Sequence, residues 1–233
     1  MDAVPVIAID GPSGAGKGTV SRMLAERLQW HLLDSGALYR LVALAGQQHD
    51  LAAQDVDGHA AQARALDVRF EVNPDGTERV LLDGRVVTDR IRTEQAGMGA
   101  SRVAAWPAVR TALLARQRAF AAPPGLVADG RDMGTVVFPT AALKIFLTAT
   151  AEERAQRRYK QLKDKGSAVT LAALSREIAD RDRQDSNRAV APLVPAGDAV
   201  ILDSTGHSAA EMSEAVLRLA IERRLCSPVA AKA

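Results

Sequence analysis

Cysteine is almost absent from this sequence, which has a single one, at position 226. An internal disulfide and a cysteine-based zinc site are therefore excluded. Aromatic residues make up only 3% of the chain, so the core has to be built from leucine, valine, isoleucine and alanine. The sequence also lacks an apolar run as long as a membrane span, and its N-terminus lacks the pattern of a signal peptide. We therefore expect a cytoplasmic protein.

Charge of one sign is not in excess either. The formal net charge is +2, with 30 Lys and Arg residues against 28 Asp and Glu residues. This balance gives no reason to expect a nucleic-acid or membrane partner. The four histidines show no metal-ligand spacing, and no long apolar stripe indicates a dimer, so we expect a monomer with small-molecule partners.

The most informative feature that is present is a glycine-rich run between an apolar segment and an amphipathic one. It reads Gly11-Pro12-Ser13-Gly14-Ala15-Gly16-Lys17-Gly18-Thr19. This order predicts a strand, a phosphate-binding loop and a helix, whose N–H groups and positive N-terminus bind a nucleoside triphosphate. Lys17 is placed to reach the β- and γ-phosphates, and Thr19 to lie beside Mg²⁺, directly or through water. Gly18 stands where the strict motif has Ser or Thr, a form typical of nucleoside monophosphate kinases.

Five short apolar runs are predicted to be parallel strands covered on both faces, in an α/β fold. They are Val4–Ile9, Trp30–Leu33, Leu126–Ala128, Leu143–Leu147 and Val200–Leu202. The polar residues that follow them are Asp10, Asp34, Asp129, Thr148 and Asp203. Ligands of open α/β sheets bind beyond the carboxyl ends of the strands, so the Asp positions among these are candidates for a site. Helical patterns alternate with the strands, and a capping box at Ser208–Glu211 begins the last helix.

One segment breaks this alternation. Asp67–Val72 alternates in polarity, and a strong turn signal follows at Asn73-Pro74-Asp75-Gly76. Two further short runs, Arg79–Leu82 and Arg85–Val87, are joined by the hairpin dipeptide Asp83-Gly84. These patterns predict a small antiparallel meander inserted into the α/β core, followed by helical sequence through Arg102.

Arginines gather in a helix that a second capping box, Thr150–Glu153, is expected to begin. Arg154, Arg157 and Arg158 are spaced to share one helix face, where like charges repel unless a polyanion relieves them. By itself the pattern also fits a solvated basic face whose charges are neutralised by nearby glutamates. Beside a phosphate loop, we interpret it as a lid that clamps phosphate.

Two further charged stretches are open to two interpretations. Arg181, Asp185 and Arg188 either form a self-paired helix end or hold a phosphate and a ribose. In Asp129–Asp132, directly after a strand, Arg131 is able to bind a phosphate with two hydrogen bonds, and Asp132 is able to accept from a base. A plain turn at the strand end is the alternative.

At this point the chain resembles the bacterial cytidylate kinases. The matching stretches are Asp10–Thr19, Trp30–Arg40, Asp129–Pro139, Lys144–Leu147, Asn187–Pro195 and Leu202–Thr205. The resemblance implies a P-loop fold with a five-stranded parallel sheet wrapped by helices, a small antiparallel insert and a helical lid. The segments expected are a core at 1–60, a monophosphate-binding insert at 61–104, core at 105–149, a lid at 150–187, and core with the C-terminal helix at 188–233.

The resemblance also implies an activity, transfer of the γ-phosphoryl group of ATP to CMP or dCMP with Mg²⁺. It assigns cytosine recognition to Ser101, Arg110 and Asp132. It assigns ribose and α-phosphate contacts to Ser35, Tyr39, Arg40, Arg131, Arg181, Asp185 and Arg188. The lid arginines Arg154, Arg157 and Arg158 complete the set, with Arg157 on the ATP phosphates. The catalytic residues expected are Lys17, Arg131, Arg154, Arg158, Arg181 and Arg188.

The chemistry is consistent with this activity, because the acceptor phosphate has a second pKa of about 6 and needs no strong base. Two other interpretations remain. One is a related kinase acting on UMP, AMP or a small alcohol such as shikimate; the insert and Asp132 argue against it. The other is a nucleotide-dependent switch, but no Asn-Lys-x-Asp guanine motif occurs, and Asp129-Gly130 lacks the acidic pair of a motor ATPase.

Overall fold

The computed structural model describes residues 4–72, 77–164, 166, 168–188 and 190–227, which fall into two compact units. The first unit comprises Met1–Asp34 and Arg118–Ala233, and the second comprises Ser35–Gln117. The turn predicted at 73–76 lies outside the described residues. Among the helices that are described, none combines the length and the apolar character needed to span a membrane.

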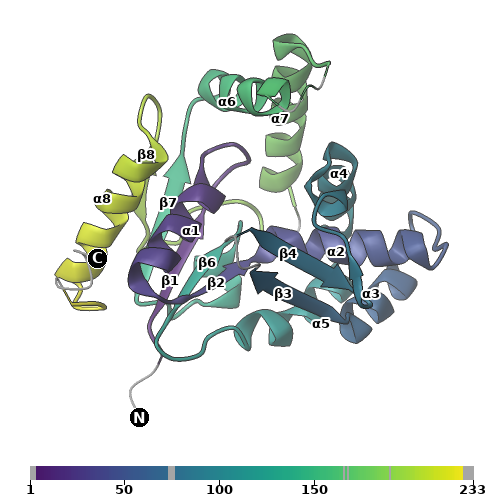
Figure 1. Ribbon diagram of the computed structural model, residues 1–233, viewed down its shortest axis with the longest axis horizontal. Helices are drawn as coiled ribbons and strands as arrows, with labels where there is room; N and C mark the ends of the chain where they lie inside the picture. The colour runs from purple at the N-terminus through teal and green to yellow at the C-terminus, as the bar shows by residue number, and fades with distance from the viewer. Residues whose placement is uncertain (1–3, 73–76, 165, 167, 189, 228–233) are drawn as a thin grey trace. The chain divides into compact units, whose positions relative to one another are not determined.

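The first unit is built on a five-stranded parallel sheet with the strand order β2-β6-β1-β7-β8 (Figure 1). The strands are β1 (Val6–Asp10), β2 (His31–Asp34), β6 (Leu126–Asp129), β7 (Leu143–Thr148) and β8 (Val200–Asp203). All five predicted strands are confirmed, with their ends shifted by one or two residues.

The two edge strands differ from the prediction that every strand is covered on both faces. All five residues of β1, the central strand, are buried. Along β8, partly buried and exposed residues alternate, and Ile201 is 61% exposed. Burial on both faces is therefore a property of the inner strands, because an edge strand lies at the margin of the layers that cover the sheet.

Two helices cover one face of this sheet. They are α1 (Lys17–Leu28) and α8 (Ala209–Glu222). Leu24 of α1 and Val216 of α8 pack with Ile7 and Ile9 of β1 in one fully buried core cluster. Ser208 and Glu211 form both hydrogen bonds of the predicted capping box, which fixes where α8 begins.

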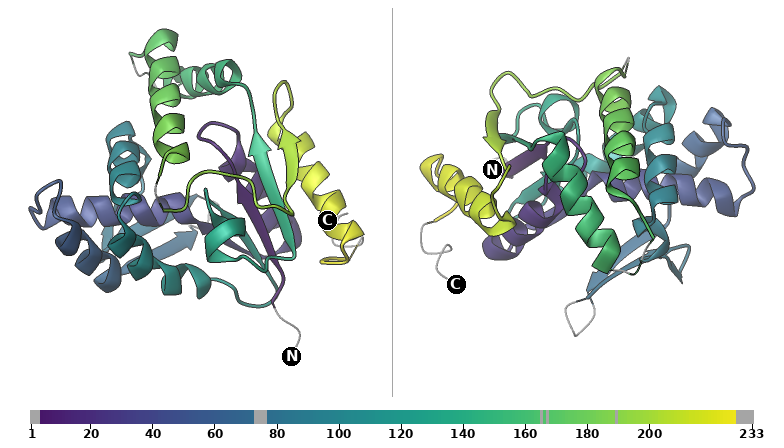
Figure 2. Two further views of the ribbon diagram at one scale, coloured as in Figure 1. Left: turned by 180° about the vertical axis from the view of Figure 1, so that it is seen from behind. Right: turned by 90° about the horizontal axis from the view of Figure 1, so that it is seen from above.

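Two further helices of this unit, α6 (Ala151–Asp164) and α7 (Leu171–Ser186), lie side by side in each view (Figures 1 and 2). The capping box predicted at the start of α6 is only half formed. Thr150 Oγ1 accepts from the Glu153 N–H at 3.2 Å, but Thr205 Oγ1 accepts from the Thr150 N–H. The Glu153 carboxylate instead accepts from Arg157, a charged donor that makes a stronger hydrogen bond than a backbone amide does.

The second unit combines helices with a three-stranded antiparallel sheet of order β3-β4-β5. Its elements are α2 (Ser35–Gln48), α3 (Val56–Ala65), β3 (Val68–Val72), β4 (Glu78–Leu82), β5 (Arg85–Val86), the 3₁₀ turn η1 (Arg90–Arg92), α4 (Glu94–Val103) and α5 (Pro107–Arg118). The predicted hairpin is confirmed, because Leu82 pairs with Arg85 and both turn residues, Asp83 and Gly84, have positive φ.

The strand register of the first unit brings together the polar residues at the C-terminal ends of the strands. Asp129 of β6 is opposite both Ile9 of β1 and Asp34 of β2, and Thr148 of β7 is opposite Asp203 of β8. The phosphate loop follows the C-terminal end of the central strand, β1. A π-helical turn, η2 (Met133–Val137), follows β6 nearby.

Candidate active site

The loop between β1 and α1 has a backbone that favours glycine. The φ angles of Gly11, Gly14 and Gly16 are +147°, +79° and +91°, a region that residues with a side chain rarely adopt. A Cβ atom at Gly11 would also overlap the carbonyl oxygen of Leu147 on β7. The loop ends at Gly16, where α1 begins, so its N–H groups and the helix N-terminus form an anion-binding element.

Lys17 is the cation of this loop. Its side chain is buried, and Nζ donates to the Pro12 carbonyl at 2.9 Å. Burial, and next the Arg131 guanidinium, lower the pKa of Lys17 to about 7, although Asp129 and Asp10 oppose the shift. An anionic phosphate at this position would restore the charge of the ammonium group, so the electrostatics of the loop favour an anion as its ligand.

The position after Lys17, where the motif departs from its strict form, has little room for a side chain. A Cβ atom at Gly18 would lie 3.3 Å from Asp129 Oδ2, closer than most real Cβ contacts. A serine or threonine is therefore crowded here, and the hydroxyl group comes one residue later, on Thr19. Thr19 is exposed in the first turn of α1, so its hydroxyl is accessible to a ligand.

A cluster of opposite charges surrounds Asp185, which is buried at the C-terminal end of α7. Arg131 Nε donates to Asp185 Oδ2 at 2.9 Å, and Arg188 donates to Asp185 Oδ1. Burial alone would raise the pKa of Asp185, but the Arg131 and Arg188 guanidinium groups outweigh it and hold the pKa below its ordinary value. Arg181 contributes in the same direction. The structure therefore brings these four sequence-predicted residues together.

Asp132, beside Arg131, is 3% exposed and has an irregular backbone, with φ −146° and ψ 25°. It directly precedes the π-helical turn η2. The predicted pair Arg131 and Asp132 thus stands on a short loop between β6 and this turn.

The three arginines predicted to form a lid do not share one environment. Arg154 is buried, and its two terminal nitrogens donate to Asp182 of α7 at 2.9 and 2.6 Å. It also donates to the Ser13 carbonyl in the phosphate loop at 3.1 Å. Arg158 pairs with Gln161 on its own helix. Repulsion along this helix is thus relieved partly within the protein.

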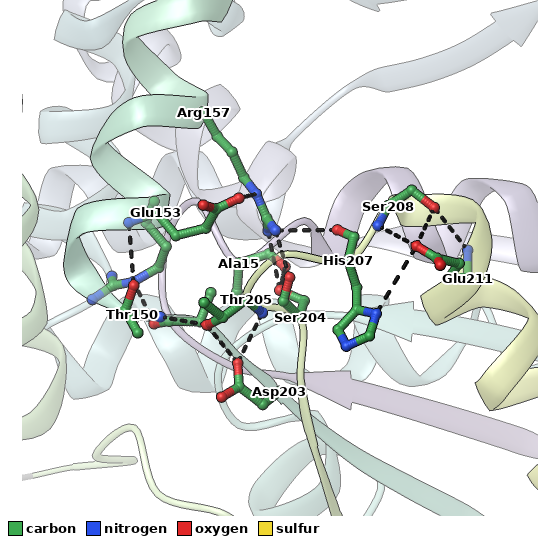
Figure 3. A network of polar contacts seen from close by, with 12 residues as sticks. Ala15, Thr150, Glu153, Arg157, Asp203, Ser204, Thr205, His207, Ser208 and Glu211 are labelled. Carbon is green, nitrogen blue, oxygen red and sulfur yellow. Dashed lines mark hydrogen bonds and ion pairs between the residues drawn. The ribbon is translucent and has the colours of Figure 1, made fainter.

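Arg157 joins three elements of the first unit (Figure 3). Nε donates to Glu153, and the terminal nitrogens donate to the hydroxyl and carbonyl of Ser204 and to the His207 carbonyl. The Ser204 hydroxyl lies 3.0 Å from the Ala15 carbonyl in the phosphate loop. Helix α6, the loop after β8 and the phosphate loop are therefore connected through one buried serine.

The remaining predicted residues belong to the second unit. Ser35 Oγ donates to Gln117 Oε1 at 2.7 Å, and both residues are buried. Arg110 lies over the Tyr39 ring, 5.8 Å from its centroid, and donates to the Ala104 carbonyl at 3.2 Å. Arg40 and Ser101 are partly buried.

Several polar residues of these clusters were not assigned a role from the sequence, among them Asp10, Gln117, Asp182 and Ser204. Asp10 was predicted only as one of the candidate site positions at the strand ends, with no role of its own. Asp182 was part of a run of mixed charge. No local pattern distinguishes Gln117 or Ser204, because their partners are far away in the sequence.

Taken together, the fold and this loop define a P-loop nucleotide-binding protein. The chain is similar to a solved thymidylate kinase from Candida albicans at 14% identity and a TM-score of 0.41, over 97% of this chain and 95% of that chain. Among curated proteins, it is 62% identical over 218 residues to a cytidylate kinase of Pseudomonas aeruginosa, and 57% identical over 212 residues to one of Marinomonas. These matches cover 93% and 91% of this chain and 95% and 93% of the relatives.

The family model for cytidylate kinase matches residues 7–222. The chain therefore belongs to the cytidylate kinase family, as the sequence motifs had indicated.

Proposed function

We propose that the chain transfers the γ-phosphoryl group of ATP to CMP or dCMP, giving CDP or dCDP and ADP. The observation that carries this proposal is the buried Lys17 of the phosphate loop, whose pKa is lowered by burial and next by Arg131, a member of the arginine cluster around Asp185. The cytidylate kinase family supports CMP as the acceptor, whereas no observation favours the alternative of another acceptor or a switch.

On the donor side, the loop at 11–19 binds the ATP phosphates. Lys17 exchanges its bond to the Pro12 carbonyl for a bond to phosphate oxygen, which returns the ammonium group to its charged form. Arg154 and Arg158 stabilise the charge of the transferred group, and Arg157 contacts the ATP phosphates. Arg154 is already placed beside the loop by its bond to the Ser13 carbonyl.

On the acceptor side, a set of residues in the first unit binds the phosphate and ribose of CMP. Arg131, Arg181 and Arg188 take the phosphate, and Asp185 accepts from the ribose. Because the Asp185 carboxylate now accepts from Arg131 and Arg188, its burial holds both guanidinium groups in place before the substrate arrives.

Recognition of the base rests on Asp132, Ser101 and Arg110, and further substrate contacts come from Ser35, Tyr39 and Arg40. Asp132 is buried and accepts from the exocyclic amine of cytosine. Uracil has a carbonyl oxygen at that position, so it would face the carboxylate with no proton to donate. A site built on such a hydrogen bond rejects the analogue that lacks it by on the order of 10⁴-fold.

Magnesium fits the oxygen donors present beside the loop. Thr19 presents an exposed hydroxyl in the first turn of α1, and Asp129 Oδ2 points toward the same turn at Gly18. Hydroxyl and carboxylate oxygens are the ligands that Mg²⁺ prefers. We propose that Thr19 holds the ion, directly or through water; when bound, it neutralises phosphate charge.

The chemical step needs little more from the protein. A phosphate oxygen of CMP attacks the γ-phosphorus, and the bond from that phosphorus to the bridging oxygen breaks, so that ADP leaves with the electron pair. The acceptor is already an anion at neutral pH, since its second pKa is about 6. The side chains of this chain therefore align the two phosphates and neutralise their charge.

The test is ADP formation with Mg-ATP and, in separate reactions, CMP, dCMP, UMP, AMP and shikimate. Rapid turnover with CMP and dCMP alone is expected. Lys17→Met, which has an unbranched, uncharged side chain one atom shorter, is the matched inactive control. Turnover with a different acceptor would overturn the cytosine assignment, and turnover with none would favour a binding protein. The lid at 150–187, the insert at 61–104, the monomeric state and the cytoplasmic location stay predictions.

A further inference from the structure

Asp10, the last residue of β1, carries a buried carboxylate that the proposed reaction does not use. The residue is 4% exposed. Its Oδ1 accepts from the Met133 N–H and its Oδ2 accepts from the Gly134 N–H, both at 2.8 Å. These are the first two N–H groups of the π-helical turn η2, where a helical element has no acceptors of its own. Asp10 thus caps this turn from a different element, more than a hundred residues away in the sequence.

The capped turn begins directly after the loop that carries Arg131 and Asp132. On the other side of these two residues, the Gly130 N–H donates to the Ile9 carbonyl of β1 at 3.1 Å. Three hydrogen bonds to Ile9 and Asp10 therefore enclose the Arg131–Asp132 loop. The phosphate loop starts at the residue after Asp10. The C-terminal end of β1 therefore anchors both the phosphate loop and the Arg131–Asp132 loop.

Packing around the enclosed loop leaves little room for another arrangement. A Cβ atom at Gly130 would lie 2.7 Å from the Met133 side chain, and one at Gly134 would lie 3.2 Å from the Lys144 side chain. Lys144 is itself fixed, since its Nζ donates to Asp198 at 2.9 Å. The loop is therefore held both by this packing and by the hydrogen bonds to Ile9 and Asp10 on either side of it.

We propose that Asp10 is a positioning residue for the acceptor substrate, because its carboxylate holds Arg131 and Asp132 in register with the phosphate loop. The inference rests on the proposed function, in which Arg131 and Asp132 contact CMP. Asp10 acts through the backbone of Met133 and Gly134 and touches neither substrate. Burial raises the pKa of Asp10 to about 6, although both N–H groups oppose the shift, so the carboxylate is ionised at neutral pH.

Asp10→Asn is the variant that tests this role. The amide keeps the size of the side chain but offers one oxygen, and its NH₂ group would face an N–H donor, so one of the two bonds is lost. We expect the KM for CMP to rise by about tenfold or more, because small misplacements of binding groups are costly in catalysis. The KM for ATP should rise less than the KM for CMP, since the phosphate loop keeps its own contacts, although the variant also removes a negative charge that supports the charged form of Lys17.

A matched control is Asp55→Asn. Asp55 also caps a helix through a carboxylate oxygen, accepting from the Gly58 N–H at 2.8 Å, but it has no part in the Arg131–Asp132 loop. Both KM values should stay unchanged in this variant. Asp10→Glu, which keeps the charge and both oxygens on a longer side chain, should raise the KM for CMP less than Asp10→Asn does.

The outcomes separate the two proposals. If the wild type lacks CMP-dependent turnover, the proposed function fails whatever Asp10 does. If the wild type phosphorylates CMP and Asp10→Asn has the same KM for CMP, only the Asp10 inference fails. If Asp10→Asn and Asp10→Glu both lose ATP binding together with CMP binding, Asp10 serves the fold alone and the inference is also overturned.

Discussion

At the scale of the residue, the charge of Lys17 determines the electrostatics of the phosphate loop. Lys17 is 5% exposed, and its ammonium group, bound to one carbonyl, is costly to keep charged. The Arg131 guanidinium adds repulsion, and together these effects lower the pKa of Lys17 to about 7. A phosphate bound by the loop would therefore favour the charged form of Lys17.

ATP binding should consequently take up a proton. Because bound phosphate raises the pKa of Lys17 from about 7, binding is strongest at low pH and weakens as pH rises above about 7, by up to about tenfold per pH unit. Calorimetry with Mg-ATP at pH 8, in two buffers that differ in ionisation enthalpy, should show uptake of about one proton. Lys17→Arg, which stays charged, should show almost none. Binding by the wild type without proton uptake would contradict this account.

Gly11 offers a steric prediction at the same scale. Gly11→Ala would place a Cβ atom against the Leu147 carbonyl at a φ of +147°, so the loop has to shift away from β7. We expect roughly 2–4 kcal/mol of lost stability and no measurable ATP binding. Gly197→Ala, where a Cβ atom meets nothing within 4 Å, should change the free energy of unfolding by less than about 0.5 kcal/mol. Urea unfolding measures both, and equal effects would refute the steric argument.

At the scale of the element, a partly buried ion pair joins α6 to α7. Arg154, whose side chain is 6% exposed, meets Asp182, whose side chain is 28% exposed, with two hydrogen bonds. Asp180 and Arg183 form a superficially similar pair on α7, but both side chains are 69% exposed. Burial makes the difference. Solvent screens the charges of an exposed pair, whereas a buried charge is left uncompensated when its partner is removed.

Asp182→Ala should therefore destabilise the protein by about 2–3 kcal/mol, below the full value for a buried pair because Asp182 is partly exposed. Asp180→Ala should cost less than about 0.5 kcal/mol. The free energies of unfolding of the two variants, measured by urea titration at the same pH, check this. If Asp182→Ala were as mild as its control, α6 and α7 would be held together mainly by apolar packing.

Local sequence predicted these elements well where the signal lies in neighbouring residues. The capping box of α8 and the Asp83-Gly84 hairpin are confirmed, because a cap or a two-residue turn is decided by the conformation of a few residues. The capping box at Thr150 was wrong in part. The predicted hydrogen bond from the Thr150 N–H to Glu153 does not form. The Thr150 N–H donates to Thr205 and Glu153 accepts from Arg157 instead, and only the folded chain brings these groups together.

At the scale of the whole molecule, ligands that bind only the folded state stabilise it. ATP or CMP at 100 times its Kd should add about 2.7 kcal/mol, which corresponds to a rise in Tm of about 5–10 °C for a chain of this size. Lys17→Met should lose most of the rise with ATP and keep the rise with CMP. Thermal unfolding with each nucleotide alone measures this. A variant that lost both shifts would show that Lys17 supports the acceptor site as well.

The sequence by itself determined the family, the five strands, the phosphate loop and the identity of the residues that stand at the strand ends. Each of these depends on contiguous residues, such as the run at 11–19, whose conformation is set by glycine and by apolar periodicity. Only the tertiary structure decided which partners these residues find. Asp185 meets Arg131, Arg154 meets Asp182, and Asp10 caps the turn at Met133, because strand order and packing bring together positions that no local pattern connects.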